Sequence, residues 1–290
     1  LVEIGGSFRL PDIMAAAGVK LVEVGTTNRT RLSDYERAIS DSTALMMRCH
    51  PSNFRMVGFS EDVSIEELVG LGRRYGIPVV DDVGSGALVD LESYGLRGEP
   101  LVRHSVEAGA DVVTFSGDKL MGGPQAGLAV GTARHVDAMA FNPIARCLRL
   151  DKLTIAALES TLRLYQDPST VMTRIPTLTA IARPADEIER AARQLRDSLL
   201  AAHGDRIHAE VIEGYSEVGG GSLPGERLET RLLALEVVGL SAMQLASALR
   251  SSDPPVVGRV GEGRLLLDLR TVSSEEKQDI HRAVSELVND

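Results

Sequence analysis

The sequence of 290 residues contains no tryptophan, and aromatic residues make up only 3% of it. Cysteine is scarce as well, since Cys49 and Cys147 are the only two. This excludes a disulfide framework and predicts a reduced, cytoplasmic protein. No apolar run is long enough to span a bilayer, because the longest candidate, 232–240, contains Glu236. The first residues lack the basic region of a signal peptide, so we expect neither a membrane protein nor a secreted one.

Positive charge is in deficit. There are 31 lysines and arginines against 41 aspartates and glutamates, which gives a formal net charge of −10. That is the wrong sign for a surface that grips nucleic acid by itself. The histidines and cysteines show no metal-ligand spacing, so no metal site is predicted. Hydrophobic residues at 43% and charged residues at 25% are typical of a globular protein with one large or two ordinary domains.

Strand and helix patterns alternate through the first half of the chain. Strands are expected at 20–24, 44–49, around Val79, at 111–115 and at 128–131. Helices are expected from the capping boxes Ser33-x-x-Glu36 and Ser64-x-x-Glu67, the second ending at Gly76, and at 101–108. Strands separated by helices of this length are typical of a mainly parallel sheet covered by helices. Residues 1–7 begin in mid-pattern, as though further strands preceded them.

The second half has a different pattern. A connecting helix is expected at 151–165, and a long helix follows Pro184 as far as about His203. Strands at 207–212, 230–237 and 265–269 come next, with helices at 241–250 and from the capping box Ser273-x-x-Glu276. We therefore expect a large domain at 1–150, a connecting helix at 151–167 and a smaller α+β domain at 168–290. The glycines at 219–221 predict a flexible loop between strands.

Lys119 is the most informative residue. It follows an apolar strand, with Ser116 three residues before it and a glycine-rich loop after it. A lysine that is poorly solvated on its strand side can become neutral and nucleophilic, and the glycines allow backbone N–H groups to approach an anion. An amine beside a phosphate cradle is what pyridoxal phosphate requires of a protein, so this stretch indicates a Schiff base at Lys119.

Other interpretations of the Lys119 stretch are weaker. Ser116-x-x-Lys119 also matches penicillin-recognising enzymes, but their S-D-N and K-T-G motifs do not occur in the chain. A Walker P-loop needs a Gly-Lys pair, and the chain contains none. The plain alternative is a solvated lysine in a surface loop. Taken alone, the stretch leaves catalysis and this plain alternative open.

Asp81 and Asp82 end a short buried strand that begins at Val79. In open α/β sheets, ligands bind at the carboxyl ends of the strands. A carboxylate there can keep a pyridine nitrogen protonated, which makes the ring an electron sink. Neighbours on a strand face opposite sides, so only one of the two aspartates can face the ring. We favour Asp81, with Val83 packed on the face of the ring, but Asp82 and an ordinary strand-end cap remain open.

Four stretches together resemble one known family: 23–30, 50–53, 80–86 and 115–119. They are similar to bacterial selenocysteine synthase, or L-seryl-tRNA(Sec) selenium transferase, and the resemblance covers essentially the whole chain. The most specific motif is Ser-Gly-Asp-Lys-Leu-x-Gly-Gly-Pro-Gln-Ala-Gly at 116–127. The resemblance implies an α/β fold-type I pyridoxal-phosphate-dependent transferase with a smaller C-terminal α+β domain.

The resemblance also implies roles for individual residues. Lys119 matches the Schiff-base lysine, and Asp118 matches its acidic neighbour. Cofactor-binding roles fall on Asp81 at the ring nitrogen, Ser116 at the phosphate and Asn53 at the ring hydroxyl, beside the ring contact of Val83 expected above. Arg146 and Arg149 match two arginines that bind the selenium donor, and we expect them on one face of a helix because they are three residues apart. His50, beside a proline at a strand end, is expected to be structural.

The implied reaction converts seryl-tRNA(Sec) to selenocysteinyl-tRNA(Sec) with selenophosphate, through an aminoacrylyl intermediate on pyridoxal 5'-phosphate. The family's chains are longer and carry a leading domain that docks tRNA, which is expected to be missing here. The family also implies a homo-oligomer, at least a dimer and up to a ring of dimers. Two alternatives remain: a related lyase that acts on a small phosphorylated amino acid or amino sugar acid, and an inactive truncated subunit.

Overall fold

The computed structural model describes residues 9–289, so the expectation about residues 1–7 lies outside the described range. The chain divides into two compact units. Unit 1 takes the chain up to Thr177 together with Val218–Glu226, and unit 2 takes Leu178–Glu217 and the chain from Arg227 onward. The helix expected at 151–167 belongs to unit 1 in this division.

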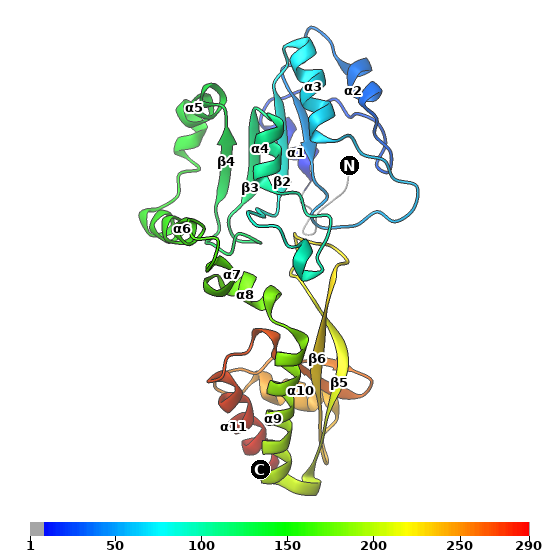
Figure 1. Cartoon of the computed structure of the whole chain (residues 1–290), viewed down its shortest axis with the longest axis vertical. Helices are drawn as coiled ribbons and strands as arrows, with labels where there is room; N and C mark the ends of the chain where they lie inside the picture. Colours follow the sequence, from blue (N-terminus) through cyan, green and yellow to red (C-terminus); the bar gives the residue numbers. More distant parts are fainter. Residues whose placement is uncertain (1–8, 290) are drawn as a thin grey trace. The chain divides into compact units, whose positions relative to one another are not determined.

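Unit 1 contains a four-stranded sheet in the order β1-β2-β3-β4 (Figure 1). Its strands are β1 (Met46–Cys49), β2 (Val79–Gly84), β3 (Val112–Ser116) and β4 (Gly127–Gly131). The first three are parallel, which confirms the expected α/β arrangement, and β4 runs antiparallel to β3. The connection 117–126 explains the reversal, because a parallel crossover takes about a dozen residues or more.

Helix α3 (Ile65–Tyr75) packs against this sheet as its sequence predicts. Ser64 and Glu67 form the expected capping box, and Gly76 ends the helix in the left-handed conformation. The buried residues Leu68 and Leu71 join a core with residues of β2 and β3. The other helices of unit 1 are α1 (Leu10–Ala16), α2 (Leu32–Ala38), α4 (Val102–Ala108), α5 (Ala133–Phe141), α6 (Lys152–Leu164) and α7 (Val171–Arg174). Helix α8 (Pro176–Ala182) crosses the boundary between the units.

Two local expectations for unit 1 are wrong. Residues 20–24 form no strand. A strand needs a neighbour that takes up its backbone hydrogen bonds, and β1, the free edge, pairs only with β2 in the described part of the chain. The capping box expected at Ser33 is also wrong, because the backbone N–H of Arg31 donates to Asp34 instead, over 2.8 Å. Glu36 accepts a hydrogen bond from Tyr75 at the end of α3.

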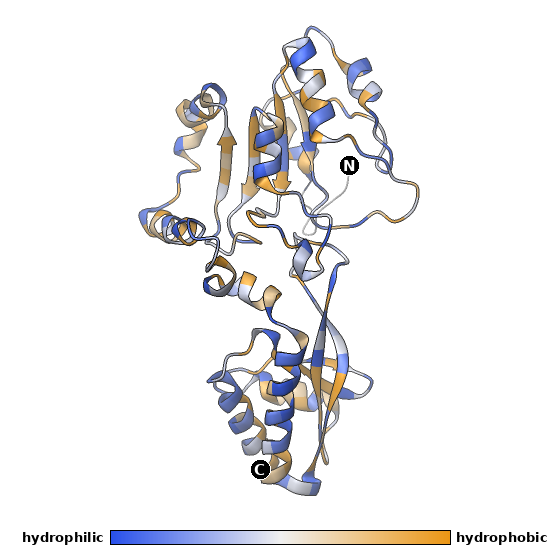
Figure 2. Ribbon diagram, viewed as in Figure 1, coloured by the Kyte–Doolittle hydropathy of each residue, from blue (hydrophilic) through white to orange (hydrophobic). Residues whose placement is uncertain are grey.

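Unit 2 is built on an antiparallel sheet in the order β5-β6-β8-β7. Its strands are β5 (Ile207–Glu217), β6 (Arg227–Val237), β7 (Arg259–Gly261) and β8 (Arg264–Asp268). Helices α9 (Ala185–His203), α10 (Ala242–Arg250) and α11 (Glu276–Asn289) pack against it. Hydrophilic and hydrophobic residues are mixed along β5 and β6, and α9 and α11 show many hydrophilic residues (Figure 2). Each helix and each strand predicted for this half is present; β5 and β6 are longer than expected, and β7 was not predicted.

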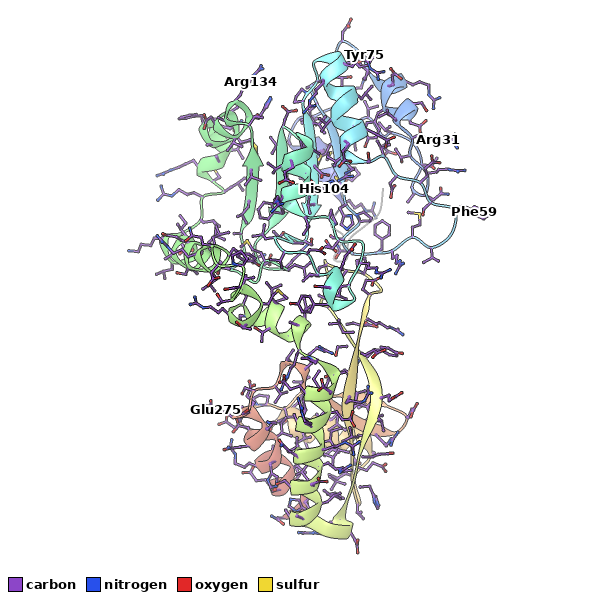
Figure 3. The ribbon with its side chains drawn as sticks, in the orientation of Figure 1. Arg31, Phe59, Tyr75, His104, Arg134 and Glu275 are labelled. Atoms are coloured by element: carbon purple, nitrogen blue, oxygen red, sulfur yellow. The ribbon has the colours of Figure 1, made fainter. Side chains whose placement is uncertain are left out.

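Neither a membrane-spanning helix nor a cluster of metal ligands is found within residues 9–289. No helix in this range is long and apolar enough to cross a bilayer. The same residues contain no group of three or more histidines, cysteines, aspartates or glutamates that could hold a metal ion. His104, labelled in Figure 3, lies on α4, where its Nε2 is 2.6 Å from Oε1 of Glu66 on α3. It links two helices at the surface of unit 1.

Candidate active site

Lys119 lies in the connection between β3 and β4, at the carboxyl end of the parallel strands (Figure 1). The backbone N–H of Leu120 donates over 3.0 Å to the carbonyl of Ser85, which follows β2. Within the connection, the N–H of Gly123 donates to the carbonyl of Gly117 over 2.8 Å. The connection is thus bonded to itself and to the neighbouring strand, which fixes the backbone from which Lys119 projects.

Side chains anchor the same connection. Leu120 and Met121 are fully buried. Tyr165, at the end of α6, donates its hydroxyl to the carbonyl of Met121 over 2.9 Å. Burial raises the pKa of Tyr165 to about 12, so the hydroxyl keeps its proton and remains a donor at neutral pH. Two buried side chains and one donor therefore hold Lys119 at this edge of the sheet.

The amine of Lys119 is not committed to another group. Its side chain is partly exposed, and the neighbouring Asp118 is exposed. Among residues 9–289, Nζ makes no hydrogen bond or ion pair. A β-carbon placed on Gly221 would lie 2.8 Å from Nζ and 2.7 Å from Cε, so the backbone of Gly221 lies against the end of this side chain. An amine in this state is available for covalent chemistry.

Asp81 on β2 is fully buried. Its Oδ1 accepts from Nε of Arg48 over 2.8 Å, and its Oδ2 accepts from Nη2 of Arg48 over 2.8 Å. Oδ2 also accepts from the hydroxyl of Ser105 on α4, over 2.6 Å. This bidentate ion pair and the hydrogen bond from Ser105 compensate the cost of burying the charge of Asp81. A carboxylate has about four lone-pair positions, so one further donor can still be accepted.

Asp82 and Val83 differ from Asp81 in their surroundings. Asp82 is partly buried and accepts from the hydroxyl of Thr114 on β3, over 2.8 Å. Its side chain faces the opposite side of the sheet from Asp81, since strand neighbours alternate. Val83 is fully buried and belongs to the hydrophobic core of unit 1, at the point where the register of β2 and β3 shifts. The two aspartates are therefore held by different partners on different faces.

The remaining predicted cofactor contacts lie at the same carboxyl edge. Ser116 is the last residue of β3 and is partly buried. Asn53 is exposed beyond β1, and its Nδ2 donates to the hydroxyl of the buried Ser52 over 3.4 Å. Ser85 was not predicted as a site residue; it is fully buried, and its Oγ has no hydrogen-bond partner in the described part of the chain.

A second feature that sequence reasoning missed is Glu99. Its side chain is 4% exposed, and Oε1 has no hydrogen-bond partner within residues 9–289. Oε1 lies 3.8 Å from Nε2 of His50, and Oε2 accepts from the backbone N–H of Leu223 over 3.0 Å. Burial lowers the pKa of His50, although the nearby Glu99 acts in the opposite direction. The sequence around Glu99 is typical of an ordinary surface turn, Gly98-Glu99-Pro100. It therefore gives no indication of a functional residue.

The expectation that Arg146 and Arg149 share a helix face is wrong. Arg146 ends a short 3-10 helix, Pro143–Arg146, and Arg149 lies beyond it in an irregular segment. Asn142 starts the short helix by capping Ile144, and Asp151 caps the following α6. Two separate caps so close together leave no room for one continuous helix between them. Both arginines are exposed.

The chain's residues fit pyridoxal phosphate at two points. The amine of Lys119 matches the aldehyde, and a buried carboxylate with one free acceptor position matches the ring nitrogen. The unbonded Oγ of Ser85 adds a buried polar atom beside the Lys119 connection. The fold is that of the fold-type I pyridoxal-phosphate enzymes. A solved D-glucosaminate-6-phosphate ammonia-lyase has the same fold, with a TM-score of 0.57, 20% identity, and coverage of 96% of this chain and 66% of that one.

The chain belongs to the SelA family, described as L-seryl-tRNA selenium transferase, whose profile matches residues 1–273. An L-seryl-tRNA(Sec) selenium transferase of Alkaliphilus oremlandii is 47% identical over 288 residues, covering 99% of this chain and 62% of the relative. The enzyme of the same name from Geobacter sulfurreducens is 46% identical over 289 residues, covering 100% and 63%. The chain thus spans less than two thirds of their length. Family and fold together indicate pyridoxal 5'-phosphate as the cofactor.

Proposed function

We propose that this chain carries the cofactor-binding part of an L-seryl-tRNA(Sec) selenium transferase, which converts seryl-tRNA(Sec) to selenocysteinyl-tRNA(Sec) with selenophosphate as the donor. Membership of the SelA family supports this reaction over that of a lyase for small phosphorylated substrates. The observation that carries the proposal is the position of Lys119. Of the four lysines in the sequence, it is the one that directly follows a strand of the unit 1 sheet, with its amine unpaired in the described structure.

When bound, pyridoxal phosphate supplies an electron sink for negative charge at the Cα of an attached amino acid. Lys119 holds the aldehyde end and moves the proton at Cα, and the exposed Asp118 beside it assists proton transfer to the leaving hydroxyl. General acid–base help of this kind is worth about 10²–10⁴-fold in rate. Ser116 binds the phosphate and Asn53 the ring hydroxyl, both from the carboxyl edge of the sheet.

Asp81 is our proposed partner of the ring nitrogen, with Val83 beneath the ring. Arg48 and Ser105 support this role, because they hold the carboxylate rigidly and leave it one acceptor position. Asp82 is the alternative. Asp81→Asn and Asp82→Asn separate the two, since the true ring partner is the one whose loss weakens cofactor binding.

Arg146 and Arg149 are proposed to bind the oxyanion of selenophosphate. Both are exposed and three residues apart, so they can converge on one anion without sharing a helix. The surrounding surface is apolar: Phe141, Leu148 and Leu153 are 86%, 74% and 75% exposed. A surface of this kind supports a covering partner, and we propose a homo-oligomer, at least a dimer, working in the cytoplasm. The tRNA would be docked by a segment outside this chain.

The lysine assignment is tested by reducing the protein with borohydride in the presence of pyridoxal phosphate and mapping the adduct by mass spectrometry. We expect the adduct on Lys119 in the parent protein and its loss in Lys119→Ala. Lys152→Ala is the matched control, because Lys152 is an exposed lysine at the start of α6. An adduct that persists in Lys119→Ala, or that maps to another lysine, would refute the assignment.

The reaction is tested separately with the full-length protein. Transfer of radioactive selenium to tRNA, dependent on both seryl-tRNA(Sec) and selenophosphate, is the expected result. Release of ammonia from a phosphorylated amino sugar acid, without tRNA, would instead favour the lyase. If instead the chain itself assembles but stays colourless and forms no adduct with pyridoxal phosphate, the inactive subunit is favoured.

A further inference from the structure

The segment Val218–Glu226, here called the glycine loop, is not the free linker that its sequence predicts. It joins β5 to β6 along the chain, yet it groups with unit 1, and Gly221, Ser222 and Leu223 are buried. Its far end is held by Glu226, whose Oε1 accepts from Nη1 of Arg55 over 2.8 Å. A loop with buried residues and an anchored end has a defined position, so its contacts in unit 1 are informative.

Gly221 makes the contact that matters most. Its φ is +89°, a conformation that side chains other than glycine rarely adopt. A β-carbon here would come within 2.7 Å of Cε and 2.8 Å of Nζ of Lys119. The obstructing atoms are the end of a flexible side chain, so an added methyl group would displace the amine more readily than the sheet. Glycine is therefore required at 221 for the amine to keep its observed position.

Glu99 anchors this loop from unit 1. Its Oε2 accepts the backbone N–H of Leu223, two residues after Gly221, over 3.0 Å. Burying a carboxylate is costly, and the remaining oxygen has no hydrogen-bond partner in the described residues and only His50 at 3.8 Å. A buried carboxylate with one oxygen left without a hydrogen bond contributes little to the stability of the fold. It is better explained by a constraint on where the loop must lie.

We propose that Glu99 is a positioning residue which, through the Leu223 N–H, holds the glycine loop against Lys119 and so sets the location of its amine. The proposal rests on the proposed function only in assigning Lys119 the covalent role. Glu99 touches neither the amine nor the reacting atoms, and it acts through Gly221. The backbone of Gly221 limits the space on one side of the amine, which favours a single orientation toward the cofactor.

The test uses the cofactor-free chain and two readouts. Amide hydrogen exchange reports the Leu223 N–H, and reductive methylation mapped by mass spectrometry reports the amine of Lys119, with Lys152 and Lys277 as internal references. We expect Glu99→Ala to speed exchange at Leu223 by roughly 10- to 100-fold, the factor for losing a hydrogen bond to a charged group. Methylation of Lys119 should change while both reference lysines do not. Glu99→Gln keeps an acceptor and should restore most of the protection.

The contact itself is tested at Gly221, with two neighbouring glycines as matched controls. Gly221→Ala should alter methylation of Lys119 and weaken its adduct with pyridoxal phosphate. Gly225→Ala has a comparable positive φ of +76° but meets only Cδ of Arg55 at 3.8 Å, and Gly220→Ala meets nothing within 4 Å. Both should leave Lys119 unchanged. Circular dichroism checks that each variant is folded.

Two outcomes overturn the proposal. One is unchanged Leu223 exchange and Lys119 methylation in Glu99→Ala, and the other is an equal response of Lys119 to Gly225→Ala and Gly221→Ala. Failure of the proposed function gives a different pattern, because the methylation and exchange results would stand while pyridoxal phosphate fails to attach to Lys119. The two ideas can therefore fail independently.

Discussion

Removing the guanidinium of Arg48 should destabilise unit 1 more than any surface ion pair could. Asp81 is 0% exposed and takes two hydrogen bonds from Arg48. Arg48→Met leaves that carboxylate buried with Ser105 as its remaining donor, and breaking a buried pair in this way costs about 3–5 kcal/mol. Asp81→Asn should cost less, about 1–3 kcal/mol, because the Arg48 side chain is 24% exposed and can still reach water.

The assay is urea unfolding followed by far-UV circular dichroism, since the chain has no tryptophan for fluorescence. Arg103→Met is the matched control: Arg103 pairs with Glu107 over 2.9 Å on the exposed surface of α4, where such pairs contribute about 0.3–0.5 kcal/mol. The double variant Arg48→Met/Asp81→Asn should recover much of the loss, because it removes both charges. If Arg48→Met costs no more than Arg103→Met, the buried pair does not hold the strand end as we reason.

Two further predictions concern packing and pH. Gly72→Ala should destabilise the protein by about 1–3 kcal/mol, because the new β-carbon would lie 2.7 Å from the carbonyl oxygen of Ile77. Gly70 lies on the same helix, but its β-carbon would have no atom within 4 Å, so Gly70→Ala should stabilise the protein by about 0.5–1 kcal/mol. The pKa of His50 is lowered in the folded protein, so the unfolded chain binds this proton more readily, and stability is lost as pH falls through about 6.5. His50→Asn lacks this group, so its free energy of unfolding, measured by urea titration, should fall less than that of the parent when the pH is lowered to about 5.5.

Local patterns predicted most of the elements, because their causes are local. The capping boxes at Ser64 and Ser273 and the left-handed Gly76 start or end helices where the sequence places them. The strand at 20–24 was predicted by the same kind of pattern and is absent. A strand depends on a partner elsewhere in the chain, which an apolar run does not specify.

The candidate site was only partly predictable for the same reason. Lys119 and the Asp81–Asp82 pair could be found, because a strand end followed by chemistry-bearing residues is visible along the chain. Arg48 could not, since its role depends on lying opposite Asp81 in the register of β1 and β2. Glu99 and Gly221 are 122 positions apart in the sequence (221 − 99). They come together because Glu99 accepts the backbone N–H of Leu223, two residues after Gly221.

The position of Lys119 follows from the reversal of the sheet between β3 and β4. In a parallel crossover, a helix would begin after β3. Here the chain instead turns back into the antiparallel β4, and the short connection is held by the hydrogen bond from Leu120 to Ser85 and by Tyr165. The lysine backbone is thereby fixed, while its long side chain remains flexible and needs a separate constraint at its tip. Within unit 1, the backbone of Gly221 lies against that tip. A fixed base and a bounded end together give one amine position, which covalent catalysis requires.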